Sequence, residues 1–212
     1  MEKDLEDKLI RMVRDTFLNR EEDSGGIGYR FFHSYRVYKM CKLFLNLDDV
    51  SAKKPHEDAL LTAALFHDIG RAKSSDSIMK AVMPGHDEES AKMLMELLDG
   101  ILSKDTIEAA ANILKHHFDE DYLSIDRELF FYADEIDEIG ALDVWRMFTF
   151  AAYNKINAEN QLNYWKQKES RKYGVSWLDR FKIKSIREIA EKRLKLLMEF
   201  MEEFDKEFNV LL

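Results

Sequence analysis

Apolar residues recur at steps of three and four positions along most of this chain, which is the spacing of one buried face of an α-helix. A first helix is expected over residues 1–20, followed by a glycine-containing break, and a second over residues 29–47. Their apolar positions are Leu5, Leu9, Ile10, Val13 and Phe17 in the first, and Phe32, Val37, Met40, Cys41 and Phe44 in the second. No segment shows the strict alternation of a half-buried strand, so the sequence predicts an all-α fold.

The middle of the chain predicts further helices separated by one irregular stretch. Pro55 is expected in the first turn of a helix that runs to His67 and Asp68, and Gly70 is expected to end it in a left-handed conformation. Residues 71–85 lack a clear period and predict a loop with a short helical piece, which could act as a lid. Helices are then expected from His86 onward, over residues 105–117, and over residues 126–139.

Beyond Gly140 the pattern predicts one long aromatic-rich helix to about residue 168, with Trp145, Phe148 and Phe150 in the core. Ser176 is expected to cap a long C-terminal helix. The apolar positions of that helix are Ile186, Ala190, Leu194, Leu197, Met201, Phe204 and Phe208. This stripe is typical of intramolecular packing and leaves a homo-oligomer open. We expect a single domain over residues 1–212, with a core over 29–148 and the terminal helices, 1–20 and about 149–212, packed on it.

Composition limits the classes of protein to consider. An apolar content of 46% with 34% charged residues is typical of a soluble globular protein. The formal charge of −9 argues against a nucleic-acid partner. The single cysteine, Cys41, excludes an internal disulfide and indicates a buried spectator thiol. No apolar run has the length of a membrane span, and the acidic start is unlike a secretory signal, so we expect no membrane partner and a cytoplasmic protein.

Histidine and aspartate residues form the most informative pattern in the chain. Imidazole and carboxylate groups without a thiolate suit a divalent cation such as Mn, Fe, Co, Ni, Zn or Mg, and one or two such ions are expected as cofactor. Such an ion would activate water for attack on a substrate. The candidate metal ligands, in chain order, are His33, His67, Asp68, His86, His116, His117 and Asp134.

This order of residues resembles the HD-domain superfamily of metal-dependent phosphohydrolases, in its small single-domain bacterial and archaeal branch. FHSYRV resembles the helix of the first ligand, ALLTAALFHDIGR the central helix and its turn, and YADEIDEIGALDVWRMF the segment of the final aspartate. The resemblance covers roughly residues 29–148. It implies a helical bundle with the metal site at its centre.

The resemblance also implies roles for individual residues. His33, His67, Asp68 and Asp134 would hold a first ion, and Asp68 could bridge to a second. His86 with His116, His117 or both would hold that second ion, or bind phosphate if the site is mononuclear. Asp68, as a metal ligand, and Arg71 are the expected catalytic residues. Arg71 is the first candidate for a contact with the substrate phosphate, which needs a positive partner. Weaker phosphate candidates are Lys73, Lys80 and Arg36, while Asp137 and Arg146 are expected to orient the helix that carries Asp134.

The leading interpretation is an enzyme that hydrolyses a phosphoester of a small metabolite or nucleotide by means of metal-activated water. The residues after His116 and His117 are FDEDYLS and lack the DGxGYP motif of cyclic-dinucleotide phosphodiesterases, which disfavours that activity. One alternative is an HD-type di-iron oxygenase, since some members of the superfamily use the same ligands for iron. A non-catalytic regulatory module is a further alternative, but it predicts lost ligands, and this sequence retains all of them.

Overall fold

A computed structural model describes residues 1–20, 26–73, 85–115, 124–172 and 177–210. These residues form helices joined by turns and contain no strand, which confirms the predicted all-α class. The described chain divides into two compact units, one up to Asp134 and the other from Glu135 onward. The expectation of one domain over residues 1–212 stays a prediction. None of the described helices is both long and apolar enough to cross a membrane.

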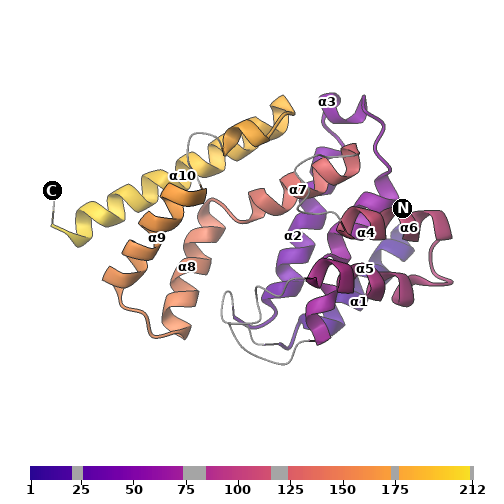
Figure 1. Cartoon of the computed structure of the whole chain (residues 1–212), viewed down its shortest axis with the longest axis horizontal. Helices are drawn as coiled ribbons and strands as arrows, with labels where there is room; N and C mark the ends of the chain where they lie inside the picture. Colours follow the sequence, from indigo (N-terminus) through magenta and orange to yellow (C-terminus); the bar gives the residue numbers. More distant parts are fainter. Residues whose placement is uncertain (21–25, 74–84, 116–123, 173–176, 211–212) are drawn as a thin grey trace. The chain divides into compact units, whose positions relative to one another are not determined.

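The first unit is a cluster of helices that Figure 1 shows in indigo to magenta, with the start of α7 in a warmer shade. Its central element is α4, which packs against α1, α2 and α6. The elements are α1 (Lys3–Phe17), α2 (Tyr29–Phe44), α3 (Asp48–Ser51), α4 (Glu57–Phe66), the 3-10 helix η1 (Ile69–Lys73), α5 (His86–Leu98), α6 (Lys104–Lys115) and α7 (Ile125–Asp137), the last of which continues into the second unit.

The sequence of α4 explains its central position. Every residue from Ala59 to Phe66 is buried, and all but Thr62 are apolar. A helix that is apolar on all sides is stable only where other elements surround it. His56 caps its first turn, because the His56 Nδ1 atom accepts a hydrogen bond from Ala59 N at 3.3 Å. The helix thus begins at Glu57, after Pro55 rather than with Pro55 in its first turn.

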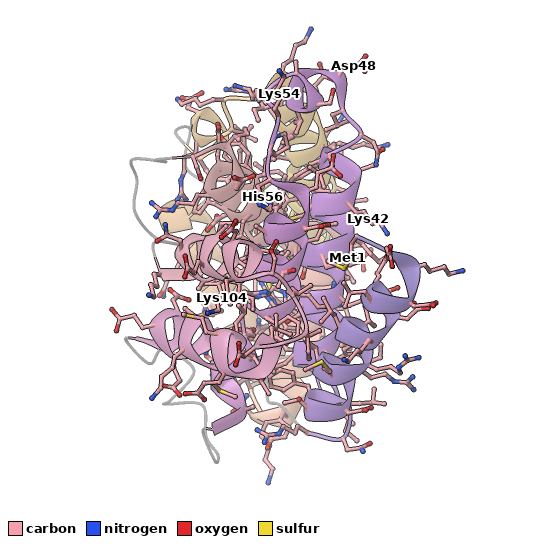
Figure 2. All side chains as sticks on the ribbon, turned by 90° about the vertical axis from the view of Figure 1, so that its right-hand side faces the viewer. Met1, Lys42, Asp48, Lys54, His56 and Lys104 are labelled. Atoms are coloured by element: carbon pink, nitrogen blue, oxygen red, sulfur yellow. The ribbon has the colours of Figure 1, made fainter. Side chains whose placement is uncertain are left out.

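Polar contacts fasten α1 to its neighbours. Glu6 Oε1 accepts hydrogen bonds from Tyr38 Oη at 2.5 Å and from Lys42 Nζ at 2.7 Å, both on α2. The Met1 amino group lies 2.8 Å from Asp58 Oδ1 on α4. Figure 2 labels Met1 and Lys42, one partner in each of two of these contacts. Hydrogen bonds from Lys42 and Tyr38 lower the pKa of Glu6, so this carboxylate stays ionised and keeps both partners.

The second unit contains the end of α7 and the helices α8 (Ala141–Tyr153), α9 (Ala158–Lys172), η3 (Leu178–Arg180) and α10 (Lys184–Phe208). The prediction of one helix from Gly140 to about residue 168 is wrong, since residues between Tyr153 and Ala158 leave the helical conformation. Lys155 has a φ of 55°, which an α-helix cannot include. Trp145 and Phe148 are 49% and 39% exposed, so their assignment to the core is also wrong.

The long C-terminal helix is confirmed, but its predicted start directly after Ser176 is wrong. Helix α10 begins at Lys184 after Ile183, whereas the predicted cap, Ser176, lies outside the described residues. The apolar stripe of α10 is buried at Ile186, Ala190, Leu197 and Met201. Intramolecular packing is therefore confirmed for these four positions, whereas Leu194 and Phe204 are half-buried and Phe208 is exposed.

Candidate metal centre

Three helices of the first unit bring His33, His67 and Asp134 together. His33 lies in the middle of α2, His67 directly follows α4, and Asp134 lies in the last turn of α7. The two histidines are 6% and 7% exposed, while Asp134 is half-buried. One nitrogen or oxygen atom from each of the three lies within 4.8 Å of the others. This group could hold a divalent metal ion, and the predicted role of each residue as a ligand stays a prediction.

The distances within this group suit a shared cation. His33 Nε2 lies 3.0 Å from His67 Nε2 and 3.1 Å from Asp134 Oδ1, and His67 Nε2 lies 3.8 Å from the same oxygen. Two donor atoms that each bind an ion at about 2.1 Å and at a right angle to one another are about 3.0 Å apart. The three atoms therefore have the spacing and the chemistry of ligands to a single divalent ion.

Neighbouring groups hold the two imidazole rings in the orientation that a metal requires. His67 Nδ1 lies 2.8 Å from the carbonyl oxygen of Ala64, to which it can donate its proton, leaving the Nε2 lone pair toward His33. Phe130 packs against the ring of His67, and Tyr29 stacks on His33 at an interplanar angle of 7°. Burial lowers the pKa of His67 despite the opposing effect of Asp68 and Asp134, so the ring is neutral at pH 7.

Asp68 lies beside this group but is held by two arginines. Arg30 Nη1 donates to Asp68 Oδ2 at 2.9 Å, and Arg71 Nε donates to Asp68 Oδ1 at 2.6 Å. Asp68 Oδ2 lies 4.0 Å from His33 Nε2 and 3.7 Å from His67 Nε2. Burial alone would raise the pKa of Asp68, but Arg30, His67 and Arg71 together hold it well below its ordinary value. Asp68 is thus an ionised carboxylate next to the histidine pair.

Close packing at Gly70 fixes the turn that carries His67 and Asp68. Gly70 N donates to Ser90 Oγ on α5 at 3.0 Å. A Cβ atom on Gly70 would lie 2.7 Å from Ser90 N and 3.0 Å from the His86 carbonyl oxygen. Gly70 is not among the glycines with positive φ, so the predicted left-handed conformation is wrong. The glycine is required because the turn touches the start of α5.

Replacing Gly70 with alanine is expected to destabilise the protein by about 1–3 kcal/mol, because the contacts at Ser90 N and the His86 carbonyl are with backbone that must shift. Urea unfolding in the presence of a chelator measures the change. The control is Ala91→Gly at a buried position of α5, which should lower stability without adding an atom and so without overpacking. Gly100→Ala is unsuitable as a control because the φ of Gly100 is 71°, where an alanine would be strained. A Gly70→Ala variant with unchanged urea midpoint would contradict the packing explanation.

The remaining predicted site residues divide into those with described contacts and those without. His86 begins α5, and its Nε2 lies 2.9 Å from Asp87 Oδ1 rather than within the group of three. Arg36 lies on α2, half-buried, one turn beyond His33. Lys73 ends η1, but its side chain is not described. His116, His117 and Lys80 lie outside the described residues.

Asp137 and Arg146 both belong to the second unit. Asp137 is buried at the end of α7, and Arg146 on α8 binds Asp143 Oδ1 through Nη2 at 2.5 Å. Arg146 Nη2 also donates to the carbonyl oxygen of Glu138 at 3.3 Å. The contact with Glu138 attaches α8 to the residue that follows α7, and the predicted role in orienting Asp134 stays a prediction.

Arg30 is the residue of the site that the sequence prediction missed. It precedes His33 by three positions, so the two side chains lie on the same face of α2. That spacing was a usable signal, since a basic residue one turn before a candidate ligand faces the same space. Cys41, in contrast, is buried, and burial raises the pKa of its thiol, in agreement with the predicted spectator role.

The group of three lies next to a cluster of opposite charges. Two imidazoles and a carboxylate could hold a divalent ion, and the guanidinium groups of Arg30 and Arg71 lie on the adjacent Asp68. A ligand with negatively charged oxygens could contact both an ion held here and the two guanidinium groups.

Several solved structures resemble this chain across nearly its full length. Bacillus subtilis YpgQ, crystallised in complex with ADP, is 19% identical with a TM-score of 0.66, and the match covers 95% of this chain and 96% of that one. An HD-superfamily hydrolase from Bacillus thuringiensis is 21% identical with a TM-score of 0.65 over 98% and 97% of the two chains. A predicted HD-superfamily hydrolase from an uncultured Thermotogales bacterium is 20% identical with a TM-score of 0.63 over 95% and 92%. At these identities the likeness shows a shared fold.

A search of curated proteins gave no match. The model of the family described as HD domain matches residues 30–139, a range that begins at Arg30, contains His33, His67 and Asp68, and ends after Asp134. The match spans just over half of the chain and includes His33, His67 and Asp134 together with Asp68 and its two arginine partners. This chain therefore belongs to the HD domain family.

Proposed function

We propose that the protein is a metal-dependent phosphohydrolase that hydrolyses a phosphoester of a small metabolite or nucleotide. The observation that carries the proposal is the placement of Arg30 and Arg71 on Asp68, which lies within 4.0 Å of both histidine Nε2 atoms. A phosphoryl group carries several negatively charged oxygens, and two guanidinium groups beside a metal site are suitable partners for them.

His33, His67 and Asp134 would hold the divalent ion, and Asp68 supplies a further carboxylate oxygen next to them. When bound, such an ion would act as a Lewis acid toward water and toward a phosphoryl oxygen. Because its pKa is held low, Asp68 is a weak base. We therefore assign Asp68 to metal binding and to holding the two guanidinium groups, rather than to proton abstraction.

Arg30 and Arg71 would bind the phosphoryl oxygens of the substrate. Their side chains are 14% and 17% exposed, so they reach solvent while their charges stay partly desolvated, which strengthens contacts with an anion. The guanidinium fork suits phosphate oxygens better than an ammonium group does. The ADP complex of the similar Bacillus subtilis protein supports phosphorylated compounds, and nucleotides first, as the substrates to test.

The experiment is a screen for phosphate and pyrophosphate release after removal of all metal with a chelator. The protein is reloaded separately with each candidate ion and tested against nucleotides and sugar phosphates, with a His67→Ala variant as control. Release of either product by the wild type with at least one ion, and its loss in the variant, would support the proposal. Iron recovered from anaerobically purified protein, with dioxygen consumption and no phosphate release, would instead indicate the oxygenase alternative.

Replacing Arg30 with alanine is expected to lower kcat/KM by about 10–1000-fold, because one of the two proposed phosphate contacts is lost. Arg30→Lys should recover only part of this, since lysine keeps the charge but loses the planar fork. Steady-state kinetics with the best substrate of the screen measure both effects. Arg11→Ala, at an exposed position of α1, is the matched control and should be neutral. Full activity of the Arg30→Ala variant would exclude Arg30 from substrate binding.

A further inference from the structure

The second unit carries a set of large apolar side chains at its surface. Trp145, Phe148, Leu196, Phe200 and Phe208 are each between 39% and 49% exposed. With Phe204 they form what we call the aromatic face, on α8 and α10. The Phe148 ring lies 5.5 Å from that of Phe204 and 6.2 Å from that of Phe200, and the Phe208 ring lies 6.3 Å from that of Phe204, so these four rings form a connected cluster. Single exposed apolar residues are common, but a contiguous cluster is typical of an interaction surface.

The aromatic face borders the row that packs α10 within its unit. That inner row is buried at Ile186, Ala190, Leu197 and Met201. Leu196 and Phe200 each lie one residue before a member of this row, whereas Phe204 and Phe208 continue it three and seven residues after Met201. The apolar surface of α10 is therefore wider than its buried row, and it stays partly exposed at Leu196, Phe200 and Phe208.

Charge along α10 changes sign at its midpoint, which is Leu196. Residues 184–195 contain five basic and two acidic side chains, a net charge of +3. Residues 197–208 contain one basic and five acidic side chains, a net charge of −4. Ion pairs inside the helix, such as Lys195 with Glu199, join neighbouring turns and leave this polarity in place.

We propose that α10 pairs antiparallel with α10 of a second copy of this chain, about a twofold axis near Leu196, with the aromatic face enclosed. In this arrangement the acidic half of each helix lies opposite the basic half of the other, at both ends of the pair. The ring of Phe200 would face the stem and ammonium group of Lys192 of the second copy, since both lie four residues from the axis. Parallel pairing would place like charges together, so charge selects the antiparallel form.

The size of the surface suits a reversible pair. A helix of 25 residues, such as α10, is about 37 Å long, and the 13 residues of α8 span about 20 Å. With a width of about 10 Å for each helix, the two present about 570 Å². This area is near the ~600 Å² per partner at the lower end of specific protein interfaces.

The test is a charge exchange read by sedimentation velocity. K184E/K192E/K195E turns the first half of α10 from +3 to −3, because each replacement changes the charge by two, and E199K/E202K/E203K turns the second half from −4 to +2. The wild type should sediment as a dimer of 25.0 kDa chains. Each variant alone should dissociate, with a dimer Kd at least about tenfold higher, because like charges now oppose each other. An equimolar mixture should form a heterodimer, in which opposite charges face each other again.

Two controls separate pairing from general effects of charge and folding. K3E/K8E/K92E makes the same total change at exposed positions of the first unit and should remain dimeric. Phe200→Glu should be monomeric with an unchanged circular dichroism spectrum. A wild type that stays monomeric at high micromolar concentration, variants that remain dimers alone, or a mixture that does not re-form a dimer would each overturn the proposal. If the wild type is monomeric and Phe200→Glu lowers its melting temperature, another part of the same chain covers the aromatic face. That outcome would also overturn the proposal.

Discussion

Replacing Asp134 with alanine is expected to lower hydrolysis by about three orders of magnitude or more and to weaken divalent-metal binding by at least about a hundredfold. Asp134 Oδ1 lies 3.1 Å from His33 Nε2 and contributes the negatively charged oxygen of the group. Without it, two neutral imidazoles would have to hold the ion. Steady-state kinetics and isothermal titration with Mn²⁺, on protein stripped of metal, measure the two losses.

The stability of the metal-free Asp134→Ala protein should change by no more than about 1 kcal/mol, because Asp134 is half-buried and borders the surface. Glu135→Gln is the matched control, since Glu135 Oε2 accepts from Trp177 Nε1 at 3.1 Å and lies outside the group of three. Metal affinity of Asp134→Ala equal to that of Glu135→Gln would show that Asp134 is not a ligand.

Replacing Asp68 with alanine is expected to remove hydrolysis and also to destabilise the metal-free protein by about 3–5 kcal/mol, because two guanidinium groups would lose their buried carboxylate partner. Asp68 is 2% exposed and accepts from Arg30 and Arg71 at 2.9 and 2.6 Å. Urea unfolding in the presence of a chelator measures the loss apart from any contribution of bound metal.

The two alanine variants are therefore expected to differ in stability in the absence of metal, with a large loss for Asp68→Ala and a small change for Asp134→Ala. Asp68→Asn keeps one oxygen for the arginines and should lose less stability than Asp68→Ala. Combining Asp68→Ala with Arg30→Gln and Arg71→Gln should restore part of the loss, since the unpaired charges are removed with their partner. A metal-free Asp68→Ala protein as stable as the wild type would contradict the ion-pair role.

The fold class, most of the helices and the candidate ligands His33, His67 and Asp134 could be predicted from the sequence, because each is indicated by a pattern in the order of residues. Helical spacing of apolar residues identified α1, α2, α4 and α10, and the order of His33, His67 and Asp134 indicated a shared metal. The first signal is a repeat of apolar positions, and the second is an order of metal-binding residue types, so both can be read from the sequence alone.

The errors concern features that depend on what lies nearby in space. The break at Lys155 has no glycine or proline to mark it, and its positive φ is visible only in the structure. A left-handed backbone conformation is the predicted reason for a glycine at position 70. The structure shows a different reason, which is the close approach of Ser90 on α5. Trp145 and Phe148 resemble core residues in composition, and exposure cannot be read from residue type. Arg30 was overlooked because its partner Asp68 is 38 positions away in the chain.

The most direct test of the metal centre is an anomalous diffraction map from crystals of the full chain grown with Mn²⁺. The expected result is a peak within bonding distance of His33 Nε2, His67 Nε2 and an Asp134 carboxylate oxygen, since these atoms already lie within 4.8 Å of one another. A fully occupied peak elsewhere on the chain, with these three side chains outside its coordination sphere, would contradict the assignment.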